Sequence, residues 1–211
     1  MSIVRALAAL AAGLAASFAA SAAEIEYAVV YRALEAARGI DAYPRLRAVQ
    51  RVESKRAGIA PRTIRIAIRA RDGRIDVPVA TDGTLALPVD DALLAENPVV
   101  VTNQPPGSLT LTLSIELAQP EGATLVAAEV EAALVEADAL LARQQSRARV
   151  RGVEFRFEGD ARVVLHGDGD QVLVPDRHGR VVVMRDPDLR ERCREIELSA
   201  RPLRILPFLD Q

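Results

Sequence analysis

Apolar and polar residues alternate along several short stretches of the chain. Between Thr63 and Ile68, the residues Ile64, Ile66 and Ile68 fall on one face of an extended backbone. From Ser108 to Leu117, leucine and isoleucine alternate with threonine, serine and glutamate. A period of two is typical of a strand with one buried face. These stretches predict β-strands.

Two Asp-Gly pairs separate the strands of this region. Asp72-Gly73 follows the first strand, and Asp82-Gly83 comes ten residues later. Glycine accepts a positive φ without strain, so both pairs favour tight turns. The pattern predicts an antiparallel meander. Asp90 then follows Pro88 as the expected N-cap of a short helix.

A different period marks two helices. Tyr27, Val30, Tyr31 and Leu34 form one apolar stripe, which predicts a helix over 27–38. A second helix is expected over 125–146, with Thr124 as its N-cap. Its apolar stripe comprises Val126, Val130, Ala133, Leu134, Ala137 and Leu141, and its polar face carries Glu129, Glu131, Glu136 and Asp138. An acidic polar face argues against binding to anionic lipid and favours a helix that covers a sheet.

The chain resembles itself at an offset of 96 residues. Asp72-Gly73 then falls on Asp168-Gly169, and Gly83 falls on Gly179. Further matched pairs are Leu93 with Leu189, Ile68 with Val164, and Val100 with Ile196. We therefore expect two tandem repeat units, each opened by a helix, although chance similarity of two β-meanders is the alternative.

These patterns predict an α+β fold with antiparallel sheet. The expected organisation is two β-rich, sandwich-like units, each preceded by an amphipathic helix. Residues 1–23 are assigned to a signal peptide, 24–118 to the first unit and 119–211 to the second.

The N-terminus has the composition of an export signal. Arg5 precedes an apolar or small run from Ala6 to Ala20, which ends in Ala20-Ser21-Ala22-Ala23. Small residues at these positions suit cleavage after Ala22 or Ala23 and predict a periplasmic location. A membrane anchor is the alternative, but the run is shorter than the roughly 20 residues that span a bilayer. No stable membrane insertion is expected after cleavage.

Composition excludes several classes of function. Cys193 is the single cysteine, so the mature chain cannot form an internal disulfide. Tryptophan is absent and aromatic residues make up 3% of the chain, which disfavours sugar platforms and base-stacking surfaces. Nucleic acid is a poor partner for an exported chain with this composition.

Charge is distributed in blocks. Residues 45–74 hold ten basic and two acidic residues, whereas 75–142 hold eleven acids and no base. The two blocks could neutralise each other across neighbouring strands. Alternatively, Arg45, Arg47, Arg65 and Arg69 could form a face for an envelope protein or an anionic envelope polymer.

Candidate chemistry is sparse. His166 and His178 lie near Asp168, Asp170 and Asp176, but these acids adjoin turn glycines, where aspartate bonds the local backbone. Cys193 lies between two arginines in a segment expected to be helical from Asp188 to Glu195, with the thiol packed toward the sheet. No catalytic set, metal site or cofactor motif is predicted.

Several segments together resemble a family of small exported proteobacterial proteins of unknown function. They are the YPRLR segment, GRIDVPVATDGTLALPVDDALLAENPVVVTNQ, SLTLTLSIEL and VRGVEFRF. The resemblance implies a periplasmic address and assigns no catalytic residue.

The primary hypothesis is a soluble periplasmic, non-catalytic binding or accessory protein of the cell envelope. One alternative is a hydrolase or thiol-dependent enzyme that uses Cys193 or the two histidines, His166 and His178. Another is a structural subunit that pairs through an exposed edge strand at Ser108–Leu117.

Overall fold

The computed structural model describes residues 23–210, and the predicted signal segment before Ala23 lies outside them. The chain divides into two compact units. Within the described residues, the first comprises 23–38 and Ala48–Ser114, and the second comprises Gly39–Arg47 and 115–210. The predicted first unit, 24–118, thus includes Gly39–Arg47 and 115–118 of the observed second unit.

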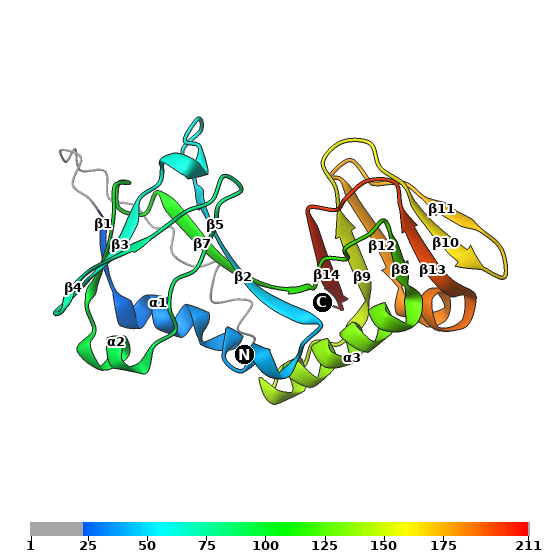
Figure 1. The fold of residues 1–211 in the computed structure, drawn as a ribbon, viewed down its shortest axis with the longest axis horizontal. Coiled ribbons are helices and arrows are strands. Elements are labelled where there is room, and N and C mark those ends of the chain that lie inside the picture. Colours follow the sequence, from blue (N-terminus) through cyan, green and yellow to red (C-terminus); the bar gives the residue numbers. More distant parts are fainter. Residues whose placement is uncertain (1–22, 211) are drawn as a thin grey trace. The chain divides into compact units, whose positions relative to one another are not determined.

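The first unit contains two antiparallel sheets (Figure 1). Its elements are β1 (Ala23–Glu26), α1 (Tyr27–Leu34), β2 (Leu46–Ser54), β3 (Ile66–Ala70), β4 (Gly73–Val77), β5 (Thr84–Leu85), α2 (Asp91–Glu96), β6 (Val99–Thr102) and β7 (Leu109–Leu117). One sheet has the order β1-β6-β3-β4 and the other β5-β2-β7. Strands β2 and β7 each continue into the second unit.

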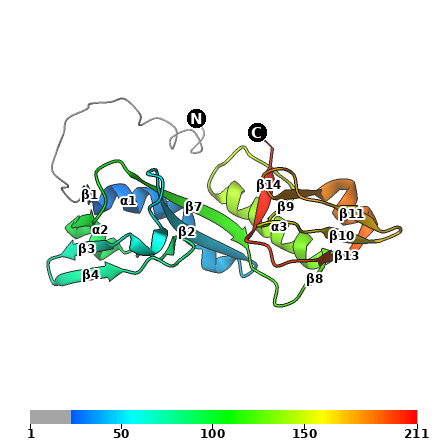
Figure 2. The same ribbon diagram turned by 90° about the horizontal axis from the view of Figure 1, so that it is seen from above.

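The second unit also contains two sheets (Figure 2). Its elements are β8 (Thr124–Val126), α3 (Ala127–Arg143), β9 (Val150–Arg156), β10 (Val163–Gly167), β11 (Gln171–Leu173), β12 (Arg180–Met184), the helical segment η5 (Arg185–Arg192), β13 (Cys193–Leu198) and β14 (Arg204–Leu209). The sheet orders are β11-β10-β13-β8 and β12-β9-β14. Mixed helices and antiparallel sheets confirm the predicted α+β class.

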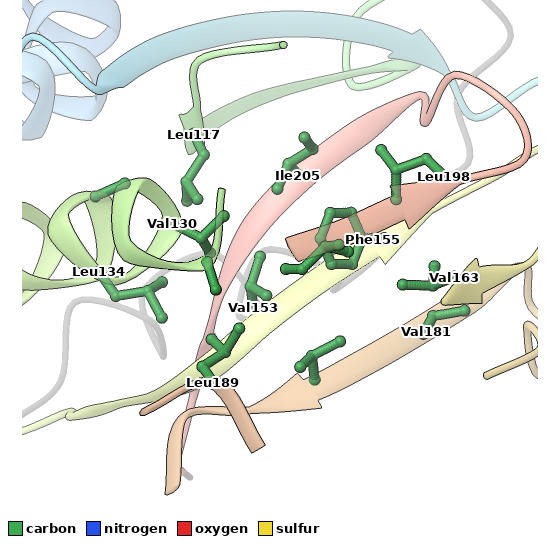
Figure 3. Packing of buried hydrophobic residues seen from close by; sticks show 14 of the residues in the cluster. Leu117, Val130, Leu134, Val153, Phe155, Val163, Val181, Leu189, Leu198 and Ile205 are labelled. Carbon is green, nitrogen blue, oxygen red and sulfur yellow. The ribbon is translucent and has the colours of Figure 1, made fainter. Parts of the chain in front are cut away.

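Each unit buries its own apolar cluster. In the first, α1 contributes Tyr27 and Leu34, which meet Ile68 of β3 and Val100 of β6. In the second, residues from α3, from η5 and from the strands β9, β10, β12, β13 and β14 converge with Leu117, as Figure 3 shows. The alternation along the strands and the stripe on each helix explain why these side chains share one interior.

Among the described residues, no helix is long and apolar enough to cross a bilayer. The longest, α3, buries one stripe and leaves its acidic face outside the core. Its predicted N-cap, Thr124, is wrong. Thr124 lies in β8 and pairs with Glu197, so the helix begins three residues later at Ala127. The N-cap is instead Val126, the last residue of β8, whose backbone is extended and whose side chain makes no cap hydrogen bond.

The predicted meander is also wrong in part. Strands β3 and β4 form the expected hairpin across Arg71 and Asp72, but β5 pairs with β2 in the other sheet. Pro78 follows β4 directly, and a residue without an N–H cannot extend the ladder. In contrast, the Asp90 cap is confirmed, because its side chain accepts hydrogen bonds from the N–H groups of Ala92 and Leu93 at 2.6 and 3.2 Å.

The offset of 96 residues between the two units does not hold in β10, where the correspondence is shifted by one residue. Buried Ile68 lies opposite Val100, and buried Leu165 lies opposite Ile196. Ile68 therefore corresponds to Leu165 rather than to Val164. The β10–β11 connection is longer than the two-residue β3–β4 turn, which absorbs the shift.

Candidate functional site

An open pocket of about 760 Å³ lies in the second unit, between the end of α3, the start of β9 and η5. Its charged lining residues are Arg147, Arg149, Arg151, Arg185, Arg190, Asp138 and Asp186. Five arginines against two aspartates make this lining basic.

The floor of the pocket is a paired arginine. Arg185 is only 8% exposed. Its Nε and Nη2 donate to Glu131 at 2.9 and 2.7 Å, and its Nη1 donates to Asp138 at 2.5 Å. Arg190 reaches the same Glu131 carboxylate at 2.8 Å. These bonds hold η5 against α3 and satisfy a charge that burial would otherwise make costly.

The pKa of the Glu131 carboxyl depends on both burial and these hydrogen bonds. Burial alone would raise its pKa, but hydrogen bonds from Arg185 and Arg190 outweigh that effect and hold the pKa below its ordinary value of 4.5. Glu131 is therefore ionised at neutral pH and engaged by both arginines.

The arginines at the rim of the pocket alternate with other residues along the chain. Val150 is buried in the core, so its neighbours Arg149 and Arg151 point outward. Asp210 pairs with Arg151 at 3.1 Å and accepts a hydrogen bond from the backbone N–H of Arg149 at 2.7 Å. Within residues 23–210, no carboxylate forms an ion pair with the guanidinium of Arg147 or Arg149. Both remain available for an anion.

The four arginines predicted to form one face are distributed over the two units. Arg45 and Arg47 belong to the second unit, and Arg65 and Arg69 belong to the first. Arg45 pairs with Glu129 and Glu136 of α3 at 3.0 and 2.8 Å. The other three are placed as follows: Arg69 pairs with Glu24 at 2.9 Å, Arg65 donates to the carbonyl oxygen of Arg62 at 3.0 Å, and Arg47 is exposed on β2. Two of the four thus have carboxylate partners.

His166 lies on β10 and contacts two carboxylates, one between β10 and β11 and one on β13. Its Nδ1 lies 3.0 Å from Asp170, and its Nε2 lies 3.0 Å from Glu197. Hydrogen bonding to Glu197, and then to Asp170, raises the pKa of His166 above 6.5. Among the described residues, no group of three histidine, cysteine or acidic side chains could hold a metal ion.

His178 lies in a different setting. Asp176 accepts hydrogen bonds from the backbone N–H groups of His178 and Arg180 at 2.8 and 3.0 Å. These bonds lower the pKa of Asp176. This is the local turn chemistry that the sequence favoured for Asp176.

Cys193 begins β13 and is partly buried. The predicted helix over 188–195 is wrong at its end, because the helical segment stops at Arg192 and the chain then pairs with β10. Its thiol donates to the carbonyl oxygen of Glu195 at 3.1 Å, and burial raises its pKa. Both ring nitrogens of His166 are engaged by carboxylates, so that imidazole is not oriented to activate the thiol.

Sequence reasoning missed the basic rim. The signal was present as arginine at every second position from 147 to 151. The predicted second helix extended to Ser146, whereas α3 ends at Arg143. The extended segment that brings these arginines to one side was therefore not anticipated.

Comparisons of this chain with protein-family models, with curated proteins and with solved structures found no match. The candidate site therefore rests on its geometry and charge.

Proposed function

We propose that this chain is a periplasmic, non-catalytic binding or accessory protein of the cell envelope, and that its second unit binds anionic groups. The observation that carries this proposal is the pair Arg147 and Arg149 at the rim of an open pocket, exposed and without carboxylate partners among residues 23–210. A guanidinium presents a planar fork of donors that matches phosphate and carboxylate.

The rest of the pocket supports the same role. Arg185 is fixed by Glu131 and Asp138, so it shapes the floor rather than serving as the first contact. Asp210 already places a carboxylate against Arg151 at 3.1 Å. The rim therefore already binds one carboxylate, and its two other arginines can bind an incoming anion. The partner class we propose is an acidic envelope protein or an anionic envelope polymer.

The export proposal rests on the leader sequence and on β1. Ala23 lies opposite Thr102, and its N donates to the carbonyl oxygen of Gln104 at 3.2 Å. Cleavage after Ala22 keeps this residue in the sheet, whereas cleavage after Ala23 removes it. We therefore favour Ala23 as the mature N-terminus. N-terminal sequencing of the native protein tests this, and an intact Met1 would contradict export.

We also propose that the two units arose by duplication. Support comes from the sheet orders, because β1-β6-β3-β4 and β5-β2-β7 recur element by element as β8-β13-β10-β11 and β12-β9-β14. The helices α1 and α3 each follow the first strand of their unit. Superposition of the two units, with Gly83 on Gly179 and Leu93 on Leu189, would fail if the duplication were wrong.

The binding proposal is tested with two polyanions as probes, polyphosphate and poly-glutamate. In the double variant Arg147→Gln/Arg149→Gln, affinity should fall about tenfold, because two charge-assisted contacts are lost. The dependence of affinity on salt should also become shallower.

The matched control is Arg162→Gln/Arg201→Gln, which removes two exposed arginines of the same unit outside the pocket lining. Its affinity should stay within about twofold of the parent protein. Equal losses in both variants would reduce the site to a general charge effect and contradict the proposal. So would unchanged affinity in the rim variant.

A further inference from the structure

Asp210 follows β14 directly and lies beside two arginines of the pocket lining. Strand β14 pairs with β9, and Leu209 lies opposite Val150 at the end of that ladder (Figures 1 and 2). Pairing continues for one more residue, because the backbone N–H of Asp210 donates to the carbonyl oxygen of Arg149 at 3.1 Å. This bond holds the side chain of Asp210 close to Arg149 and Arg151.

The two carboxylate oxygens of Asp210 have separate donors. Oδ1 accepts a hydrogen bond from the backbone N–H of Arg149 at 2.7 Å. Oδ2 accepts one from Nε of Arg151 at 3.2 Å and lies 3.1 Å from Nη2 of the same guanidinium. Backbone N–H groups and guanidinium forks are strong donors to a carboxylate. We call the Arg149 N–H and the Arg151 guanidinium together the carboxylate subsite.

The carboxylate subsite favours a charged group. The hydrogen bond from the Arg149 N–H lowers the pKa of Asp210 below its ordinary value of 3.8; the charge of Arg151 acts in the same direction, and burial opposes both. A site that lowers the pKa of a carboxyl group binds the ionised form more tightly than the neutral acid. The subsite therefore stabilises an anion, whichever molecule supplies it.

Asp210 can leave the carboxylate subsite at small cost. The side chains of Asp210 and Arg151 are 36% and 55% exposed. An exposed ion pair contributes little to stability, so another carboxylate can replace that of Asp210. Arg185 differs, because it is buried and bound to Glu131 and Asp138. Of these three carboxylates, that of Asp210 is the one an external ligand displaces most readily.

The carboxylate subsite adjoins the arginines that carry the proposed function. Arg147, Arg149 and Arg151 all line the same pocket. Within residues 23–210, the guanidinium groups of Arg147 and Arg149 have no carboxylate partner. A ligand held by these two groups therefore brings its next anionic group within reach of Arg151.

We infer that the carboxylate subsite binds a carboxylate of the anionic ligand, which displaces the side chain of Asp210. This inference rests on the proposed function and narrows the ligand to an acidic protein segment with aspartate or glutamate side chains. The occupant seen in the structure is itself an aspartate on an extended chain, and each of its oxygens has its own donor. Asp210 is then an intramolecular competitor, which occupies the subsite at high effective concentration when no ligand is bound.

The test compares Asp210→Ala with the parent protein, using poly-glutamate, polyphosphate and polygalacturonate of matched charge as probes. We expect the affinity for poly-glutamate to rise about two- to fivefold, the range for removal of an exposed ion pair that competes for the same donors. The affinities for polyphosphate and polygalacturonate should rise less, because a phosphate is tetrahedral and a uronate carboxylate lacks the methylene stem of a side chain.

The matched control repeats this substitution in the Arg151→Gln background. The change in charge is identical there, but the carboxylate subsite has lost its guanidinium, so Asp210→Ala should raise the affinity for poly-glutamate clearly less. Asp210→Asn is a second variant, because its amide oxygen can still accept from the Arg149 N–H and keep the end of β14 in place. It should raise the affinity by a smaller factor than Asp210→Ala. Thermal unfolding of every variant checks that the unit is folded.

Three results overturn the inference. The affinity for poly-glutamate is unchanged in Asp210→Ala, or it rises equally in both backgrounds, or it rises no more than the affinities for the other two polymers. The proposed function fails separately, if the parent protein binds no polyanion or if Arg147→Gln/Arg149→Gln binds as tightly as the parent. A protein that binds through Arg147 and Arg149 but is unaffected by Asp210→Ala would keep that function and lose only the carboxylate subsite.

Discussion

Gly83 and Gly179 occupy the same turn in the two units. Each carbonyl oxygen accepts a hydrogen bond, from the N–H of Val52 at 2.9 Å and of Phe157 at 2.8 Å respectively. Their φ angles are +83° and +72°. A β-carbon at Gly83 would lie 2.7 Å from the carbonyl oxygen of Val52, and one at Gly179 would lie 2.3 Å from that of Phe157. The glycines are therefore required both by conformation and by the approach of a neighbouring backbone.

Gly179→Ala should destabilise the second unit by about 3 kcal/mol, because it adds a backbone clash to the strain of a positive φ. Gly159→Ala separates the two causes. Gly159 has a φ of +78° with no atom near the added β-carbon, so only the strain remains, at about 1 kcal/mol. Urea unfolding of both variants measures the difference. Equal losses would show that the approach of Phe157 is unimportant.

Arg185→Met should cost about 3 kcal/mol of unfolding free energy at neutral pH, because it leaves Glu131 and Asp138 partly buried without their main partner. Arg190→Met should cost clearly less, since Arg190 is exposed and Arg185 still satisfies Glu131. A double variant with Glu131→Gln should recover part of the loss of Arg185→Met. Additive losses in that cycle would contradict a direct coupling.

The ion pairs of Glu131 with Arg185 and Arg190 should also make the free energy of unfolding depend on pH in the acid range. Its pKa in the folded chain lies below the ordinary value of 4.5, so the folded state favours the ionised carboxylate. The contribution is fully present above 4.5 and is lost as pH falls through the lowered folded pKa. Denaturant unfolding over this range should show a weaker acid dependence in Glu131→Gln. An unchanged dependence would assign it to other carboxyls.

The ionisation of His166 should make stability change with pH in the opposite direction. Its pKa in the folded chain is raised by Glu197 and Asp170, so the charged imidazole is favoured on folding. This contribution is present below 6.5 and is lost as pH rises through the folded pKa. NMR titration of the His166 ring should show the raised pKa, and Glu197→Gln should lower it. A pKa that ignores this substitution would mean that the pair does not persist in solution.

Cys193→Ala should cost about 1 kcal/mol, the scale of a modest truncation at a partly buried site. Burial raises the pKa of the thiol, so labelling of the folded chain near neutral pH should be slow compared with the unfolded chain. Complementation by the alanine variant should match the parent protein. Fast labelling together with loss of complementation would move the functional proposal to a thiol mechanism.

Local patterns in the sequence were enough for several elements. The stripe from Tyr27 to Leu34 predicted α1, the Asp90 cap predicted the start of α2, and the alternation from Ser108 to Leu117 predicted β7. These features depend on contacts within one element, where a period of two or 3.6 states which side is buried. The α+β class with antiparallel sheet follows from the same local information.

Only the tertiary structure decided which strands pair. The segment at Thr84–Leu85 has the pattern of a third meander strand, yet it pairs with β2. Strand β4 ends directly before Pro78, and the chain then leaves that sheet. The pairing of His166 with Glu197 was hidden for the same reason. It joins β10 to β13, and no spacing along the chain records such an approach.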